Sequence, residues 1–525
     1  MHILVLLVVS VTYESLFVHH GIAWLFDEGW PLYAAKRLHE GGVLYRDTFF
    51  LFPPGHLAPA WIAHALDPPV IVLARILYAA FNVALCIALY LLGRRLMPPS
   101  FALLGALLLA LAAPRAHLAH LLFGYRYLVW STLSLLAFSA RLRSGDHRFT
   151  IAAGAAAGVA LCFRLTPAFA VSCAVGIAAV AADRRFRSWL RDWSGFALGL
   201  LLVAAPVAAW LAHSVGFETL WRELVVRIMG LQELQSKAIP EFAFPTSWDR
   251  KLIYRSFVPV QYWMFTLMYL GYAAVLAIQW ARCVSQRRPY PHALLLAVVL
   301  WGGIYFLRTL GRSDEHHLAS ALPPACLLVA HLASLAFRTA RRRLELPERW
   351  RGATAAAVCL ALLGAWVFLQ GTDLYFDTRA RGIHRLESLK ETVFIRSERK
   401  AQRLDWRIRA LRRSTQPDDT VLDLTNAPLL HVVTDRNGPG YFDVVTPGTF
   451  MSEAEERDFI TRLDASPPAL VLWPSRDFDR LPSRSIQATA PLVSEWVTEH
   501  YQEPDPRYRR FLLVPRRSAA EVVSP

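Results

Sequence analysis

Cysteine is sparse in this 525-residue sequence, and its arrangement excludes two classes of protein. The six cysteines lie in or at the edge of apolar blocks, no two of them have the CxxC spacing, and none follows Cys359. A disulfide framework and a thiolate metal site both need closer or paired cysteines, so we expect neither. The six positions are Cys86, Cys162, Cys173, Cys283, Cys326 and Cys359.

Phosphate-binding glycine motifs are also missing, since the sequence contains neither GxGxxG nor a Walker loop. Nothing therefore indicates a nucleotide site. The net charge of +15 could suggest nucleic acid. However, no recognition module or basic helix with interleaved aromatic residues is present, and the arginines cluster in short loops between apolar blocks. We interpret them as membrane-topology signals and expect no nucleic-acid partner.

Hydrophobic residues are abundant, at 55% of the chain, and they come in blocks of roughly 20. This pattern predicts an α-helical polytopic membrane protein with about 11 transmembrane helices. The first block carries Glu14, His19 and His20 and has no basic start or small-residue cleavage motif, so we interpret it as a retained span. The predicted apolar segments are 1–24, 70–93, 101–113, 127–140, 151–163, 167–182, 195–213, 257–281, 291–310, 318–337 and 352–370.

The positions of the arginines predict the orientation of these spans. If the N-terminus is cytoplasmic, the loops on the inner face are rich in arginine and the short outer loops are poor in it, as the positive-inside rule expects. The outer loops 27–69 and 214–256, and everything after residue 370, then face the periplasm of a bacterial inner membrane. The arginines near the inner face are Arg94, Arg95, Arg141, Arg143, Arg148, Arg184, Arg185, Arg187, Arg191, Arg282, Arg287, Arg288, Arg338, Arg341, Arg342, Arg343, Arg349 and Arg351.

The composition changes after Gln370, where no apolar run of membrane length recurs. A charged helix is expected at 386–413. Buried strands at 420–424, 469–473 and 510–514 alternate with helices at 427–433, 452–463 and 493–501. This alternation predicts a small α/β domain. We therefore divide the chain into a transmembrane catalytic domain, 1–370, and a periplasmic soluble domain, 371–525.

The loop 27–69 is the strongest candidate for the active site. It opens on Asp27 and Glu28 directly after an apolar run, where carboxylates are costly and usually serve chemistry or coordination. We expect a short interfacial helix at 28–41 and a second piece at 56–66. Asp27 could act as a general base toward an incoming hydroxyl or amine, or it could cap the helix that begins at Gly29. Glu28 could raise the pKa of Asp27 or hold a cation.

Asp47 follows Arg46 in the same loop. It could form a surface ion pair with Arg46, or it could be a second catalytic carboxylate that contacts the acceptor or a metal ion. Two histidines elsewhere, His117 and His120, have a spacing of three residues that a helix could use for shared ligation. Without a nearby carboxylate they are weak evidence for a metal site.

Cations that could bind a phosphate lie at predicted outer boundaries. Arg126 and Arg164 could simply place their charges in the interface, or they could clamp a phosphate through their guanidinium groups. The sequence GRSDEHHL at 311–318 adds Arg312, His316 and His317 in one tight loop. Arg312 could neutralise a leaving phosphate, and the histidines could hydrogen-bond it or, with Asp47, hold a divalent cation. The alternative for this loop is a polar turn that faces water.

Taken together, the DE pair, the helix ending in Gly-Gly, the YRD motif, the PPG break and the GRSDEHHL loop resemble the GT-C superfamily of membrane glycosyltransferases. The likeness is to the bacterial branch related to protein mannosyltransferases and the lipid A aminoarabinose transferase. It implies transfer of a sugar from a polyprenyl-phosphate donor to an envelope lipid, glycan or protein on the outer face, with inversion. Asp27 matches the catalytic carboxylate, Asp47 a second acidic position, and Arg312 with its histidines the region that handles the carrier phosphate.

Two other functions remain open on the sequence. A secondary transporter would place ionisable residues within spans and would often contain inverted repeats, whereas here the charges concentrate at outer boundaries and no repeat is evident. A non-catalytic scaffold would present the C-terminal domain to partners in envelope assembly. It would tolerate Asp27→Asn, and it would lose its function with residues 371–525.

Overall fold

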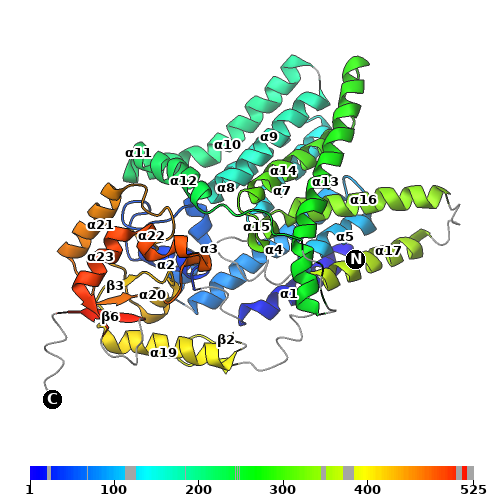
Figure 1. The fold of residues 1–525 in the computed structure, drawn as a ribbon. Helices are drawn as coiled ribbons and strands as arrows, with labels where there is room; N and C mark the ends of the chain where they lie inside the picture. Colours follow the sequence, from blue (N-terminus) through cyan, green and yellow to red (C-terminus); the bar gives the residue numbers. More distant parts are fainter. Residues whose placement is uncertain are drawn as a thin grey trace.

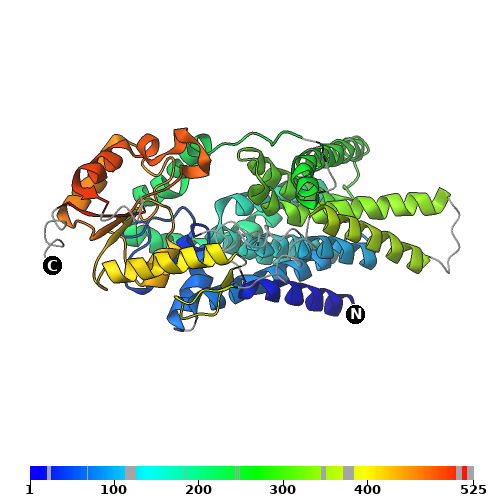
Figure 2. The same ribbon diagram turned by 60° about the horizontal axis from the view of Figure 1, so that its bottom comes forward.

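The structure is a computed structural model, and it describes residues 1–20, 25–67, 69–112, 126–183, 185–242, 244, 246, 249–343, 351–370, 384–395, 397–503 and 511–516. Its helices form a bundle at one end, and a smaller part with a β-sheet lies at the other (Figure 1). Figure 2 shows the same division, with the bundle helices running away from the C-terminal region toward the end that holds the N-terminus.

Seven helices in the described part of the chain are long and apolar enough to cross a membrane. The chain is a multi-pass membrane protein. These helices are α4 (Val70–Gly93), α9 (Leu165–Ala182), α10 (Phe186–Val215), α13 (Arg250–Ser285), α14 (Ala293–Leu310), α16 (Leu322–Arg343) and α17 (Arg351–Leu369). Four further helices of the bundle are α1 (His2–Val18), α5 (Pro99–Ala110), α7 (Leu128–Ser144) and α8 (Arg148–Phe163). Each predicted apolar segment coincides with one of these helices, so the helical multi-span fold is confirmed, and the number of spans stays a prediction.

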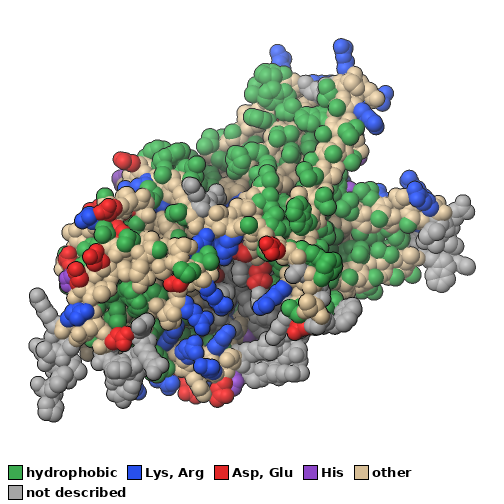
Figure 3. Space-filling view, in the orientation of Figure 1, with side chains coloured by type: hydrophobic (Ala, Val, Ile, Leu, Met, Phe, Trp, Pro, Cys, Tyr) green, Lys and Arg blue, Asp and Glu red, His purple; other side chains and the backbone are tan. Residues whose placement is uncertain are grey.

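Small residues allow α8 and α10 to pack closely. A side chain at Gly154 would place its Cβ 1.9 Å from the carbonyl oxygen of Phe196, and one at Gly199 would lie 2.0 Å from the oxygen of Ile151. Glycine is therefore required where the two backbones meet, as is common between helices in membranes. Basic side chains gather at the tips of the bundle farthest from the C-terminal region, and hydrophobic side chains cover its flanks (Figure 3).

The two loops that we predict to lie on the outer face, 27–69 and 214–256, carry short helices, and we keep the names first and second outer loop for them. The first loop contains α2 (Gly29–His39), η1 (Pro54–Leu57) and α3 (Ala58–Ala65), and the second contains α11 (Phe217–Trp221), the π-helical turn η2 (Arg222–Val226) and α12 (Arg227–Leu234). We predicted that α2 lies along the membrane interface, and its place relative to the membrane stays a prediction. It is buried from Gly29 to Lys36, because the C-terminal region packs over it. The short helix α15 (Glu315–Ser320) follows α14.

The C-terminal region is built on a four-stranded sheet with strand order β3-β4-β6-β5. β3 and β4 are parallel, and the other two pairings are antiparallel. The strands are β3 (Val421–Asp423), β4 (Leu470–Leu472), β5 (Tyr501–Gln502) and β6 (Leu512–Pro515), and the main helices are α19 (Glu398–Ser414), α20 (Leu429–Thr434), α21 (Glu453–Ala465), α22 (Ile486–Thr489) and α23 (Pro491–His500). The small turns η4 (Phe478–Arg480) and η5 (Pro482–Arg484) follow β4. The expected mixture of strands and helices is confirmed.

The predicted charged helix at 386–413 was wrong in its first part. A hairpin of β1 (His384–Arg385) and β2 (Phe394–Ile395) occupies that stretch, and α19 begins only at Glu398. Tertiary contacts explain the difference: the amide of Phe394 donates to the carbonyl of His19 at 2.9 Å, and Glu391 accepts from the first amides of α4, Ile71 and Val72, at 3.0 Å each. A carboxylate is favourable at a helix N-terminus, so this hairpin fastens the C-terminal region to the bundle.

Candidate active site

Asp27 lies in the turn just before α2, a helix that packs against α20 of the C-terminal region. Helix α2 begins at Gly29 without a side-chain hydrogen bond at its cap, so the structure does not use Asp27 as a capping residue. Among the residues that the structure describes, no group donates a hydrogen bond to the Asp27 carboxylate. Because the carboxylate has no described donor, it is available to a ligand.

Burial raises the pKa of Asp27 to about 7, against the positive charge of Arg312, which lowers it, while Asp314 raises it further. The carboxyl group therefore changes its charge close to neutral pH. A general base works best when its pKa lies near the operating pH, because it is then both ionised and basic enough to take a proton. The pKa of Asp27 lies near neutral pH because of its surroundings alone.

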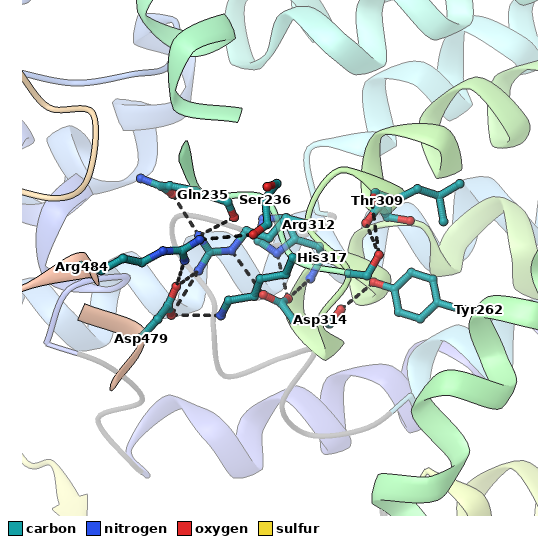
Figure 4. Close-up of polar contacts among 12 residues, drawn as sticks. Gln235, Ser236, Tyr262, Thr309, Arg312, Asp314, His317, Asp479 and Arg484 are labelled. Atoms are coloured by element: carbon teal, nitrogen blue, oxygen red, sulfur yellow. Dashed lines mark hydrogen bonds and ion pairs between the residues drawn. The ribbon is translucent and has the colours of Figure 1, made fainter. Parts of the chain in front are cut away.

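Arg312 is held from several sides in the loop after α14 (Figure 4). Its Nη1 donates to the side-chain oxygen of Gln235 at 3.0 Å, its Nε to Asp314 at 3.3 Å, and its Nη2 to Asp479 at 3.1 Å. Gln235 comes from the second outer loop and Asp479 from the C-terminal region. Three parts of the chain thus fix one guanidinium next to Asp27.

His317 lies on α15 in the same loop, and Asp314 receives its backbone amide at 2.9 Å and its Nδ1 at 2.8 Å. Burial lowers the pKa of His317, as do Arg308 and Arg312, although Asp314 opposes them. The imidazole is therefore neutral at neutral pH and keeps one nitrogen free of a proton. His316 belongs to the same helix, but its side chain lies outside the described residues.

Arg164 lies between α8 and α9 and is buried. Its Nη1 donates to the hydroxyl of Tyr127 at 3.1 Å, and its guanidinium carbon lies 4.1 Å from the ring centre of Phe52. Tyr127 in turn contacts the hydroxyl of Tyr305 at 2.8 Å. Arg308 stands over the ring of Tyr305, with 5.9 Å between its guanidinium carbon and the ring centre. Two arginines therefore face one pair of tyrosines.

Sequence reasoning missed Arg308, although a signal was present. It stands four residues before Arg312 at the outer end of an apolar block, a spacing that puts both near one side of a helix end. It also missed Asp479, which binds Arg312, and the two further cations on Asp479, Lys237 and Arg484. These lie in segments expected to be loops, and no local pattern connects them.

Glu28 and Asp47, both predicted to act with Asp27, have other partners. The Glu28 carboxylate is buried and accepts two bonds from Arg75 of α4, at 2.5 and 2.9 Å. Asp47 accepts from Arg46 at 2.8 Å and from the amide of Val43 at 2.8 Å. The hydrogen bond from Arg46 lowers the pKa of Asp47, which therefore stays ionised. The structure does not bring either residue into the contacts around Arg312.

Arg126 is also engaged elsewhere. Its Nη2 donates at 3.3 Å to Glu14 of α1, which also receives a bond from Asn82 of α4. All three side chains are buried, so this cluster ties α1 and α4 to the start of α7. Of the predicted phosphate ligands, the structure places Arg312 and His317 together, Arg164 beside Tyr127, and Arg126 on Glu14.

The predicted metal candidates were Asp47, His316 and His317. Within the described ranges, no three His, Cys, Asp or Glu side chains gather in a way that could hold a metal ion. His117 and His120 lie outside the described residues. Asp47 and His317 have the separate partners given above, so the described side chains do not assemble a metal site from them.

No family model matches the sequence, and no curated protein matches it. Solved structures do resemble it. ArnT from Cupriavidus metallidurans bound to undecaprenyl phosphate aligns with a TM-score of 0.57 and 15% identity, over 98% of this chain and 98% of ArnT. The chain has the GT-C fold.

The archaeal oligosaccharyltransferase AglB from Archaeoglobus fulgidus, in complex with an inhibitory peptide and a dolichol phosphate, agrees with this result. It aligns with a TM-score of 0.53 and 14% identity, over 90% of this chain and 68% of AglB. ArnT in its apo state covers 100% of this chain at a TM-score of 0.55. The resemblance that the DE pair and the GRSDEHHL loop indicated is confirmed at the level of the fold.

Proposed function

We propose that this protein is a membrane glycosyltransferase, which transfers a sugar from a polyprenyl-phosphate donor to an acceptor of the cell envelope on the periplasmic face. The observation that carries the proposal is Asp27, a partly buried carboxylate with a pKa of about 7 beside Arg312. The GT-C fold supports the reaction class, and the lipid phosphates bound by ArnT and AglB support a donor of that chemistry.

In the proposed reaction, the Asp27 carboxylate takes the proton of an acceptor hydroxyl or amine as that group attacks the anomeric carbon of the sugar. A new bond forms from the acceptor to this carbon, and the bond to the phosphate oxygen breaks. The electron pair leaves with the polyprenyl phosphate. Attack opposite to the departing phosphate inverts the anomeric configuration. Such general-base assistance contributes about 10²- to 10⁴-fold to a rate.

The leaving phosphate gains negative charge, so the site needs fixed cations. Arg164 and Arg308, on either side of the pair Tyr127 and Tyr305, are the group that we assign to this role. Guanidinium groups bind phosphate oxygens through two parallel donors, and the tyrosine hydroxyls can donate as well. Arg312 contributes its charge nearer to Asp27. A fixed cation that faces the departing group stabilises the transition state more than the ground state.

The loop architecture suits a lipid-borne substrate. The bundle flanks are hydrophobic on the face shown in Figure 3, and charged side chains gather along the boundary with the C-terminal region. A prenyl chain would lie against the apolar helices while its phosphate meets the charged boundary. The acceptor would reach Asp27 from the outer side. Glu28 and Asp47 have no step in this mechanism because other side chains already bind them.

The experiment that tests this function compares envelope glycolipids and glycans, by mass spectrometry, from a deletion strain and from strains that carry plasmid copies. The native chain should restore one specific sugar that the deletion strain lacks. Asp27→Asn should insert normally in the membrane and fail to restore the sugar. Asp418→Asn, the same substitution at an exposed carboxylate of the C-terminal region, is the matched control and should restore it. Restoration by Asp27→Asn would reject the transferase and favour a scaffold.

A further inference from the structure

Among the described residues, Asp479 is the acidic side chain through which the C-terminal region contacts Arg312. Asp479 lies in the turn η4, which follows β4, and its backbone has a left-handed conformation with φ of 55°. Aspartate tolerates this conformation better than most residues other than glycine. The turn directs the carboxylate toward Arg312, away from its own sheet (Figure 4).

Three cations from three segments surround Asp479. Its oxygens lie 3.1 Å from Arg312 in the loop after α14, 3.0 Å from Lys237 of the second outer loop and 2.6 Å from Arg484 of the C-terminal region. Burial raises the pKa of Asp479, but the charge of Arg312 and the bond from Lys237 outweigh it, and the net pKa is lowered. The carboxylate therefore stays ionised across the neutral range.

The backbone reinforces this junction. The amide of Lys237 donates to the carbonyl of Gly311 at 3.3 Å, and the amide of Ser313 donates to the carbonyl of Lys237 at 3.0 Å. These two bonds join the second outer loop to the loop of Arg312 as a short parallel bridge. The Asp479 carboxylate binds the side chains of both bridged residues, Lys237 and Arg312.

Arg312 is consequently bound by acceptors other than Asp27. Its three donor nitrogens contact Gln235, Asp314 and Asp479, and no hydrogen bond joins it to Asp27 among the described residues. Its charge nevertheless acts on Asp27 from this position. A guanidinium that lacked one of these acceptors would be able to form a direct ion pair with the nearby carboxylate.

We propose that Asp479 is a positioning residue of the candidate active site, which holds Arg312 close to Asp27 without letting the two form a direct ion pair. The proposal rests on the transferase function above, and it makes the C-terminal domain a working part of the catalytic centre. Asp479 acts only through Arg312 and contacts no reacting atom.

The consequence concerns the strength of the base. The charged groups that face Asp27 are Arg312, which stabilises its ionised form, and Asp314, which opposes ionisation. A direct pair with an arginine lowers the pKa of a carboxyl group by about 1 to 3 units. If Asp479 is removed and Arg312 turns to Asp27, the carboxylate becomes a weaker base. If Arg312 is removed, the pKa of Asp27 should rise instead.

The test needs no knowledge of the substrate. The purified full-length protein is treated with dicyclohexylcarbodiimide, which reacts with protonated carboxyl groups in apolar surroundings, and the labelling of Asp27 is followed against pH by peptide mass spectrometry. The native protein should show a midpoint near its pKa of about 7. Asp479→Asn should move the midpoint down by about 1 unit or more. Arg312→Gln should move it up.

Controls separate this effect from a general loss of structure. Asp477→Asn changes an exposed carboxylate two residues away and should leave the midpoint unchanged, and Asp479→Glu should keep most of the native value. The double variant with Arg312→Gln and Asp479→Asn should match Arg312→Gln alone, because Asp479 acts through Arg312. An unchanged midpoint in Asp479→Asn, or an added shift in the double variant, would overturn the proposal.

The labelling experiment can reject the role of Asp479 without rejecting the proposed function, and the two outcomes can be told apart. If Asp27→Asn still restores the envelope sugar, the transferase mechanism is rejected whatever the labelling shows. If Asp27→Asn abolishes transfer while Asp479→Asn labels like the native protein, the function stands and the role of Asp479 is rejected.

Discussion

Two charged regions lie where the C-terminal region meets the loops of the bundle, and they are built in opposite ways. Around Arg227, every donor of a buried guanidinium has an acceptor: two oxygens of Glu223 at 2.7 and 3.0 Å, Glu455 at 2.9 Å, and the carbonyl of Thr449. Around Asp27, a partly buried carboxylate has no described hydrogen-bond donor. The charge of Arg227 is bound by acceptors on every nitrogen, whereas the charge of Asp27 is affected only by charged groups near it.

This difference fits the proposal that the region around Asp27 serves chemistry, while the region around Arg227 holds the structure together. Arg227 also lies 5.5 Å from the ring centres of both Phe49 and Phe442, so it joins the first outer loop to the C-terminal region. A guanidinium whose donors are bound by protein acceptors fixes the positions of its partners, but it has no donor left to bind a substrate. The oxygens of Asp27 accept no described hydrogen bond, and the pKa of this carboxyl group lies near neutral pH, as a general base requires.

The sharpest way to test this comparison is to neutralise Asp27. Asp27→Asn should lower sugar transfer by about 10²- to 10⁴-fold, because the proton acceptor is gone. The thermal stability of the purified protein should remain equal or increase, since an amide is easier to bury than a carboxylate. Transfer is measured by envelope mass spectrometry and stability by thermal unfolding in detergent. A clear loss of stability together with activity would place Asp27 among the structural charges.

Neutralising Arg227 should give the reverse result. Arg227→Met leaves Glu223 buried without its main partner, and the loss of one member of a buried pair costs about 3 to 5 kcal/mol. Thermal unfolding of the purified protein measures this cost. Arg222→Met is the matched control, because Arg222 is 49% exposed and touches Glu223 only at 3.3 Å. Its removal should cost at most about 1 kcal/mol.

Gly29 tests whether the close packing of α2 against the C-terminal region is needed. A Cβ at this position would lie 2.1 Å from the backbone nitrogen of Leu429, so Gly29→Ala must force the two segments apart. We expect a cost of about 1 to 3 kcal/mol and faster proteolysis of the C-terminal region. Gly230→Ala, at a helical position with open space around it, should be neutral or slightly stabilising. Equal stability of the two variants would contradict tight docking.

The last expected effect is the pH dependence of stability. The folded-state pKa of Asp27 is raised to about 7 from 3.8, so the folded protein binds a proton that the unfolded chain has lost between these values. Stability contributed by Asp27 is therefore full below about pH 4 and is lost as the pH rises through 7. The difference in melting temperature between Asp27→Asn and the native protein should grow from pH 5 to pH 8. A constant difference would mean that Asp27 has an ordinary pKa.

Local sequence patterns predicted much of the fold. The apolar segments became the bundle helices, and the strands at 420–424 and 469–473 were placed correctly, because burial in lipid or in a sheet leaves a periodic or continuous hydrophobic signal. The hairpin at 384–395 was missed. Its charged residues suggested a helix, and only the distant contacts of Glu391 with α4 and of Phe394 with His19 explain its conformation.

The candidate site was predictable only in part. Asp27 and Arg312 were identified because ionisable residues at the ends of apolar runs are costly and therefore informative. The sequence could not tell which of the two neighbouring carboxylates, Asp27 or Glu28, would be paired with a cation. Arg75, almost fifty positions away, binds Glu28 in the structure, whereas Asp27 has no hydrogen-bond donor among the described residues. Asp479 and Lys237 carry no local signal, since their position depends on how two loops and a turn meet.

Hydrophobicity and the placement of arginines by themselves determined that this chain is a helical membrane protein with a small α/β region after it, because transfer of apolar side chains from water is a local and additive quantity. Tertiary structure alone decided that Glu28 is paired with Arg75, while Asp27 accepts no hydrogen bond from the described residues. The charge of a buried group depends on every neighbour within a few ångströms, and those neighbours come from segments far apart in the chain.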